Sequence, residues 1–125
     1  MRLIVTVLLL LVGVIHLLPL PGVLGSERLA ALYGLDFSDP NLALLMRHRA
    51  VLFGLLGGGC VIAAFRPAWQ GPLLTAAAIS ATSFLLLALS GGYNAAIARV
   101  VTVDAIAVGA IAIAAVLRQL DLRRR

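Results

Sequence analysis

Charged residues are scarce in this chain, and lysine is absent altogether. Asp, Glu, Lys and Arg together make up 12% of its 125 residues, about half the share of roughly 25% that is usual in a soluble domain. The mean hydropathy is +1.11. So few polar side chains do not cover the water-facing exterior of a soluble domain of this length. The composition therefore indicates a membrane protein.

Cysteine is nearly absent too, and this limits redox and metal chemistry. The single cysteine, Cys60, lies within an apolar stretch. One thiol excludes an intrachain disulfide, a CxxC redox motif and a zinc site built on cysteine pairs. The Ser-His-Asp, HExxH and paired-carboxylate patterns of common enzymes are also missing. No catalytic residue is predicted, and a non-enzymatic role is favoured.

Four long apolar stretches occupy most of the chain. A helix needs about 20 predominantly apolar residues to cross roughly 30 Å of hydrocarbon, and the stretches do not alternate as the strands of a membrane barrel do. The turns between them are short, so residues 1–125 are expected to form one integral membrane domain. The fold predicted is an all-α, antiparallel bundle of four transmembrane helices, over about residues 3–20, 42–65, 71–91 and 95–117.

The first apolar stretch also has features of a secretory signal peptide. Arg2 precedes it, and the small-residue segment 23–25 follows it. However, its apolar core of about 18 residues is longer than a signal core usually is, and it contains His16 and Pro19. We therefore expect a retained first helix.

The first loop is expected to carry a short amphipathic helix over about residues 26–36. The segment Pro19–Gly22 ends the first helix, because proline cannot continue the hydrogen-bond ladder and glycine allows a turn. Ser26 is typical of a helix start, and Leu29, Leu32, Tyr33 and Leu35 form an apolar face. Such a helix lies at the membrane surface and caps the bundle. Tyr33 and Trp69 are expected at opposite membrane–water interfaces, where amphipathic rings concentrate.

The arginines predict the orientation of the bundle. Positive residues concentrate on the cytoplasmic side of membrane proteins, and six arginines lie at positions that share one side: Arg2, Arg66, Arg118, Arg123, Arg124 and Arg125. The first loop instead sets Arg28 against three acids. We predict a bacterial inner (cytoplasmic) membrane protein with both termini cytoplasmic. Its expected partners are membrane lipids, and a homo-oligomer or a larger membrane complex is possible. No nucleic-acid partner is expected, because contacts with lipid headgroups explain the net charge of +5 better.

Six polar residues within or beside the apolar stretches are the candidate site. Ionisable side chains at membrane depth are costly and commonly functional. The predicted helix ends place all six in the outer half of the bundle: His16, Arg47, His48, Arg49, Arg99 and Asp104. We predict that this cluster faces outward and binds a lipid headgroup or a small anionic or carbonyl-bearing molecule.

Other interpretations of the same residues stay open. Asp104 can form a structural ion pair with Arg47 or Arg49, which would fix the register of two helices. It can also relay protons with a histidine in a proton-coupled transporter. Two imidazoles at similar depth, His16 and His48, can ligate a haem b iron in a haem- or quinone-linked oxidoreductase component. Ordinary hydrogen bonds are the simpler role for both histidines, so no cofactor and no metal are predicted.

Small residues four positions apart predict where helices approach closely. Gly54 and Gly58 have this spacing in the second stretch, and Ala105 and Gly109 repeat it in the fourth. Small side chains let two helix backbones come together in a membrane.

A central block of the sequence resembles a known group of proteins. The block comprises Leu32–Leu35 (LYGL), Asp39-Pro40 and Leu45–Gly54 (LMRHRAVLFG). It looks like a family of small, largely uncharacterised bacterial four-helix membrane proteins that are DoxX-like in general layout. The resemblance implies the fold and no particular activity. Some members are labelled phosphopantetheine adenylyltransferase, but that enzyme is a soluble α/β protein with a His-x-Gly-His motif, which neither His16 nor His48 matches.

Overall fold

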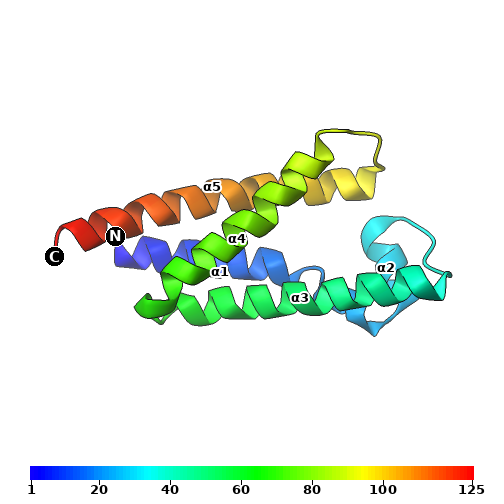
Figure 1. Cartoon of the computed structure of the whole chain (residues 1–125), viewed down its shortest axis with the longest axis horizontal. Helices are drawn as coiled ribbons and strands as arrows, with labels where there is room; N and C mark the ends of the chain where they lie inside the picture. Colours follow the sequence, from blue (N-terminus) through cyan, green and yellow to red (C-terminus); the bar gives the residue numbers. More distant parts are fainter.

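All 125 residues are described by a computed structural model, which is helical and contains no strand (Figure 1). The prediction of an all-α chain is confirmed. Four helices are long and apolar enough to cross a membrane, the first of them when α1 and η1 are taken together over Arg2–Leu24. The elements are α1 (Arg2–Leu17), the 3₁₀ helix η1 (Leu20–Leu24), α2 (Ser26–Tyr33), α3 (Pro40–Ala64), α4 (Pro67–Ala88) and α5 (Ala95–Arg123).

Proline and glycine set the ends of the first elements. α1 ends at Leu17, before the predicted residue 20, because Pro19 lies just beyond it and the chain tightens into η1. α2 ends at Tyr33 and not near residue 36, since Gly34 takes the left-handed conformation (φ 64°) that closes a helix. The short helix that caps the end of the bundle is therefore shorter than predicted.

Prolines also start the next two helices. Pro40 occupies the first turn of α3, and the Asp39 side chain caps it by accepting a 2.8 Å hydrogen bond from the Asn41 amide. α4 begins at Pro67, well before the predicted residue 71, because a proline in the first turn loses no intrahelical bond. α5 continues past the predicted residue 117 to Arg123, through arginine, glutamine and leucine residues that favour helix.

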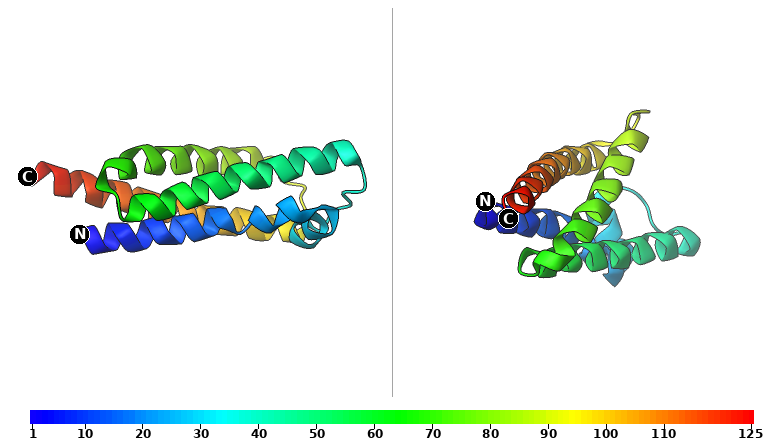
Figure 2. Two further views of the ribbon diagram at one scale, coloured as in Figure 1. Left: turned by 90° about the horizontal axis from the view of Figure 1, so that it is seen from below. Right: turned by 60° about the vertical axis from the view of Figure 1, so that its left-hand side comes forward.

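The long helices pack as neighbours around a ring. α1 packs against α3 and α5, and α4 packs against the same two helices. Consecutive long helices run in alternating directions, and both termini lie at the end of the molecule opposite α2 (Figures 1 and 2). The connection from α3 to α4 lies at the same end as the termini (Figure 1).

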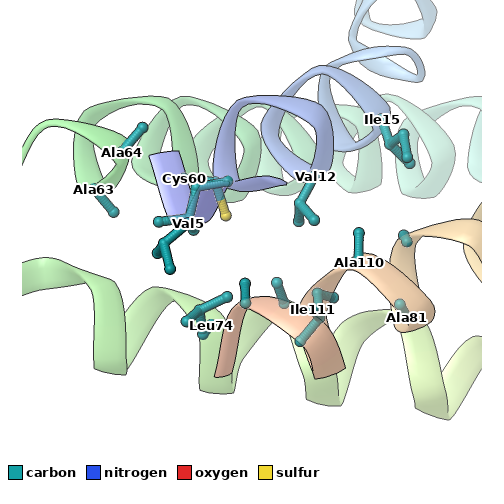
Figure 3. Close-up of a cluster of buried hydrophobic side chains, with 14 residues drawn as sticks. Val5, Val12, Ile15, Cys60, Ala63, Ala64, Leu74, Ala81, Ala110 and Ile111 are labelled. Carbon is teal, nitrogen blue, oxygen red and sulfur yellow. The ribbon is translucent and has the colours of Figure 1, made fainter. Parts of the chain in front are cut away.

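Alanine is frequent in the core, and large apolar side chains are frequent on the exterior. The buried cluster between the four helices contains seven alanines among its 14 residues, together with larger side chains such as Val5, Leu74 and Ile111 (Figure 3). Large apolar side chains point outward, as Leu3 does at 73% exposure and Leu89 at 80%. This distribution lets the helices approach closely and leaves an apolar outer surface.

The closest backbone approach joins α1 to α3 at two glycines. A Cβ atom on Gly57 would lie 2.8 Å from the Gly13 carbonyl oxygen and 3.0 Å from the Leu17 amide nitrogen. A Cβ on Gly58 would meet nothing within 4 Å, and one on Gly54 would meet only the Leu20 side chain. The prediction that Gly54 and Gly58 carry this approach is therefore wrong. The contact face of α3 is centred on Gly57.

Candidate functional site

A cavity of about 350 Å³ lies at the end of the molecule that α2 covers. Its walls come from α1, α2, α3, α5 and the turn after α1, but not from α4. Most of the lining is aliphatic, with residues such as Ile15, Leu32 and Val103. Its polar side chains are those of Tyr33, Arg49, Arg99 and Asp104.

Arg49 is the best-organised polar group of the cavity. Its Nη1 donates a 2.9 Å hydrogen bond to the Tyr33 hydroxyl, which joins α3 to α2. The guanidinium carbon lies 4.5 Å from the centroid of the Phe53 ring and 5.7 Å from that of the Tyr33 ring. Aromatic faces hold a cation without using its hydrogen-bond donors. A guanidinium has five N–H donors, so most of those on Arg49 are free for another acceptor.

Asp104 lies in the cavity wall on α5 without a protein partner. Its side chain is 8% exposed. Neither Arg49 nor His16 forms an ion pair or a hydrogen bond with the carboxylate. Both ion pairs of the structure belong to Asp121 at the opposite end, which contacts Arg2 and Arg125. The ion pair predicted between Asp104 and Arg47 or Arg49 is therefore not formed.

His16 is buried behind the cavity wall. It is 1% exposed, and its ring stacks on Phe53 with a centroid distance of 5.8 Å. Nδ1 lies 2.9 Å from the Val12 carbonyl oxygen, which can only accept, so Nδ1 carries a hydrogen and donates a hydrogen bond to that oxygen. Nε2 is buried and has no hydrogen-bond partner in the protein. An unsatisfied buried nitrogen costs about 1–3 kcal/mol.

The cover formed by η1 and α2 is fastened by two side chains. The Asn94 amide nitrogen donates a 2.8 Å hydrogen bond to the Tyr33 carbonyl oxygen, while its Oδ1 caps α5 by accepting from the Ile97 amide. On the other side, Arg47 Nε donates a 2.9 Å bond to the Val23 carbonyl oxygen. These bonds anchor the cover to α5 and α3.

The structure brings together only part of the predicted cluster. Arg49, Arg99 and Asp104 line the cavity, and His16 lies behind Phe53. Arg47 is exposed and bonded to η1, because two residues along a helix point to nearly opposite sides. His48 is exposed as well, in surroundings unlike those of His16. No group of three or more metal-ligating side chains is present.

Two aromatic residues of the site were not predicted. Phe53 lies one helical turn after Arg49, and this i,i+4 spacing could have identified it as the ring beneath the guanidinium. Tyr33 was expected at the membrane–water interface, but it is 5% exposed and turned into the bundle. Its place depends on how α2 folds back onto α3 and α5, which local sequence does not encode.

Comparison with protein-family models, curated proteins and solved structures gives no match. The cavity combines an apolar wall with free donors on Arg49 and a free acceptor on Asp104. Such a combination can hold a partly apolar molecule and orient its polar group.

Proposed function

We propose that this chain is an integral protein of the bacterial inner membrane, an antiparallel bundle of four transmembrane helices. Four sufficiently long apolar helices support this proposal, as do the small residues inside and the large apolar residues outside. Arg2, Arg66 and the arginines that end α5 belong to the end that holds both termini. The positive-inside rule then favours cytoplasmic termini and an outward-facing cavity.

Within that setting we infer a non-enzymatic binding role for the cavity under α2. The observation that carries this inference is that Arg49, which has donors to spare, and Asp104, which has no hydrogen-bond partner, line one largely apolar space. Arginine donors take an anionic or carbonyl oxygen, and Arg99 adds a second positive charge at the wall. The ligand is a lipid headgroup or a small molecule that carries such an oxygen.

Ligand binding explains Asp104 better than a purely structural role does. A buried ion pair offsets its desolvation only when the two groups make good contact. Asp104 and Arg49 share a cavity without forming that contact. A molecule placed between them would satisfy both groups at once.

Native mass spectrometry of the protein purified in a mild detergent tests this proposal. We expect a small molecule or lipid to copurify and to be lost in Arg49→Gln. Arg28→Gln is the matched control, because Arg28 is exposed at the same end of the molecule and lines neither this cavity nor the contacts that hold its cover. If Arg49→Gln and Arg28→Gln retain the same bound molecules as the unaltered protein, the cavity is not the binding site.

A further inference from the structure

A second, smaller cavity shares a wall with the first. This apolar groove has a volume of about 270 Å³, and all its lining residues except Arg49 are apolar or aromatic. Tyr33, Arg49 and Val100 line both spaces. Phe84 adds a wall from α4, which takes no part in the first cavity. The two spaces therefore meet at the Tyr33–Arg49 hydrogen bond.

The groove opens to the outside of the bundle. Leu35 and Leu42 line it and are 50% and 40% exposed. Figure 1 shows α4 rising away from α3 toward this end of the molecule. With the bundle spanning the membrane as proposed above, this apolar opening would face lipid, and an apolar chain would enter from the side without crossing water.

The polar groups define what the head of a ligand has to offer. Arg49 has donors only, so it takes an oxygen acceptor, and an anionic one best. Asp104 as a carboxylate accepts only, so it takes a hydroxyl or another N–H or O–H donor. A head with an anionic oxygen beside a hydroxyl group satisfies both residues.

We propose that the two cavities form one site for a single-chain amphiphile of the lysophospholipid type, drawn from the surrounding membrane. Its phosphate lies between Arg49 and Arg99, its free hydroxyl donates to Asp104, and its acyl chain occupies the groove. The inference rests on the proposed binding function and specifies its ligand. The two volumes together fall within the range of about 300–1,000 Å³ usual for small-molecule sites, and a groove of only about 270 Å³ favours one chain over two.

Three probes separate the contributions of head, hydroxyl and chain. They are 1-oleoyl lysophosphatidic acid, its analogue without the 2-hydroxyl, and glycerol 3-phosphate, each titrated against the detergent-solubilised protein. We expect the full probe to bind tightest and the deoxy analogue about 10- to 100-fold more weakly, because a hydrogen bond to a charged group is lost. Asp104→Asn should reduce the difference in affinity between the full probe and the deoxy analogue. Arg49→Gln should weaken the binding of every probe.

A substitution pair tests the groove. Met46→Trp places a larger side chain in the groove wall and should weaken binding of the full probe about tenfold or more. The affinity for glycerol 3-phosphate, which has no chain, should not change. Leu44→Trp is the control, since Leu44 is 67% exposed and outside both cavities. Circular dichroism checks that each variant remains folded.

The outcomes distinguish this inference from the proposed function. If glycerol 3-phosphate binds as tightly as the full probe, or Met46→Trp has no effect, the groove holds no chain and only the head site survives. If the deoxy analogue binds the unaltered protein as tightly as the full probe, the role given to Asp104 is wrong. This result needs no Asp104 variant, so it holds even if Asp104→Asn fails to fold. If no probe binds and no copurified molecule depends on Arg49, the binding function itself fails.

Discussion

Alanine at Gly57 tests the contact that holds α1 against α3. A Cβ there would lie 2.8 Å from both the Gly13 carbonyl oxygen and Leu17 Cγ. The first of these is a backbone atom, so relief requires the two helices to separate. Overpacking of this kind costs typically about 1–3 kcal/mol.

Gly58 supplies an internal control in the next position. A Cβ on Gly58 meets nothing within 4 Å. Alanine should therefore stabilise the helix there by roughly 0.5–1 kcal/mol. The same gain applies at Gly57, so the difference between the two variants isolates the clash. We expect Gly57→Ala to be less stable than Gly58→Ala by about 1–3 kcal/mol.

Unfolding in mixed micelles, followed by circular dichroism, measures this difference. Gly13→Ala should resemble Gly57→Ala, because the contact is reciprocal. Separation of the helices would also move His16 from Phe53, so Gly57→Ala should lower ligand occupancy. Equal stabilities for Gly57→Ala and Gly58→Ala would refute the packing described here.

Four further expectations concern the site, the cover, the topology and the cofactor. Asp104→Asn should weaken binding of the hydroxyl-bearing ligand about 10- to 100-fold and leave the thermal unfolding profile nearly unchanged; failure to fold would instead favour a structural role. Asn94→Ala should lower the free energy of unfolding by about 1 kcal/mol through loss of the α5 cap. It should also increase hydrogen exchange across α2, and unchanged exchange would mean that the bond to Tyr33 does not hold α2 in place. In a Cys60→Ala background, a cysteine at Ser26 should react with an impermeant maleimide from the outer side and one at Gln119 only from the cytoplasmic side; the reverse pattern would invert the predicted topology. The purified protein should be colourless, whereas a Soret band removed by substituting the histidines would support the haem alternative.

The apolar stretches and the turn residues predicted most of the helical layout. Pro40 with Asp39 and Gly34 act locally, through a missing amide, a capping carboxylate and a left-handed backbone. The errors lie at the helix ends: α1 and α2 stop a few residues earlier than predicted, beside Pro19 and Gly34. α5 runs on to Arg123 because its charged last turns are still good helix formers.

The candidate site was predicted in part. The positions of Arg49, Arg99 and Asp104 along their helices predicted that all three lie at a similar depth in the bundle. The structure places all three in the cavity wall. Rotation about the helix axis could not be assigned without knowing which face of α3 meets α1. The Gly13–Gly57 contact sets that rotation, and it turns Arg47 toward η1 and Arg49 toward the cavity.

Composition and hydropathy by themselves determined that this chain is helical and has four helices apolar enough to cross a membrane. Those properties follow from the cost of burying polar groups, which each residue carries wherever it lies. Only the tertiary structure decided which polar groups share a space, because that depends on helix rotation and on how α2 folds back. It left Asp104 without an ion pair, buried Tyr33 against Arg49, and joined a cavity that holds a few polar side chains to an apolar groove.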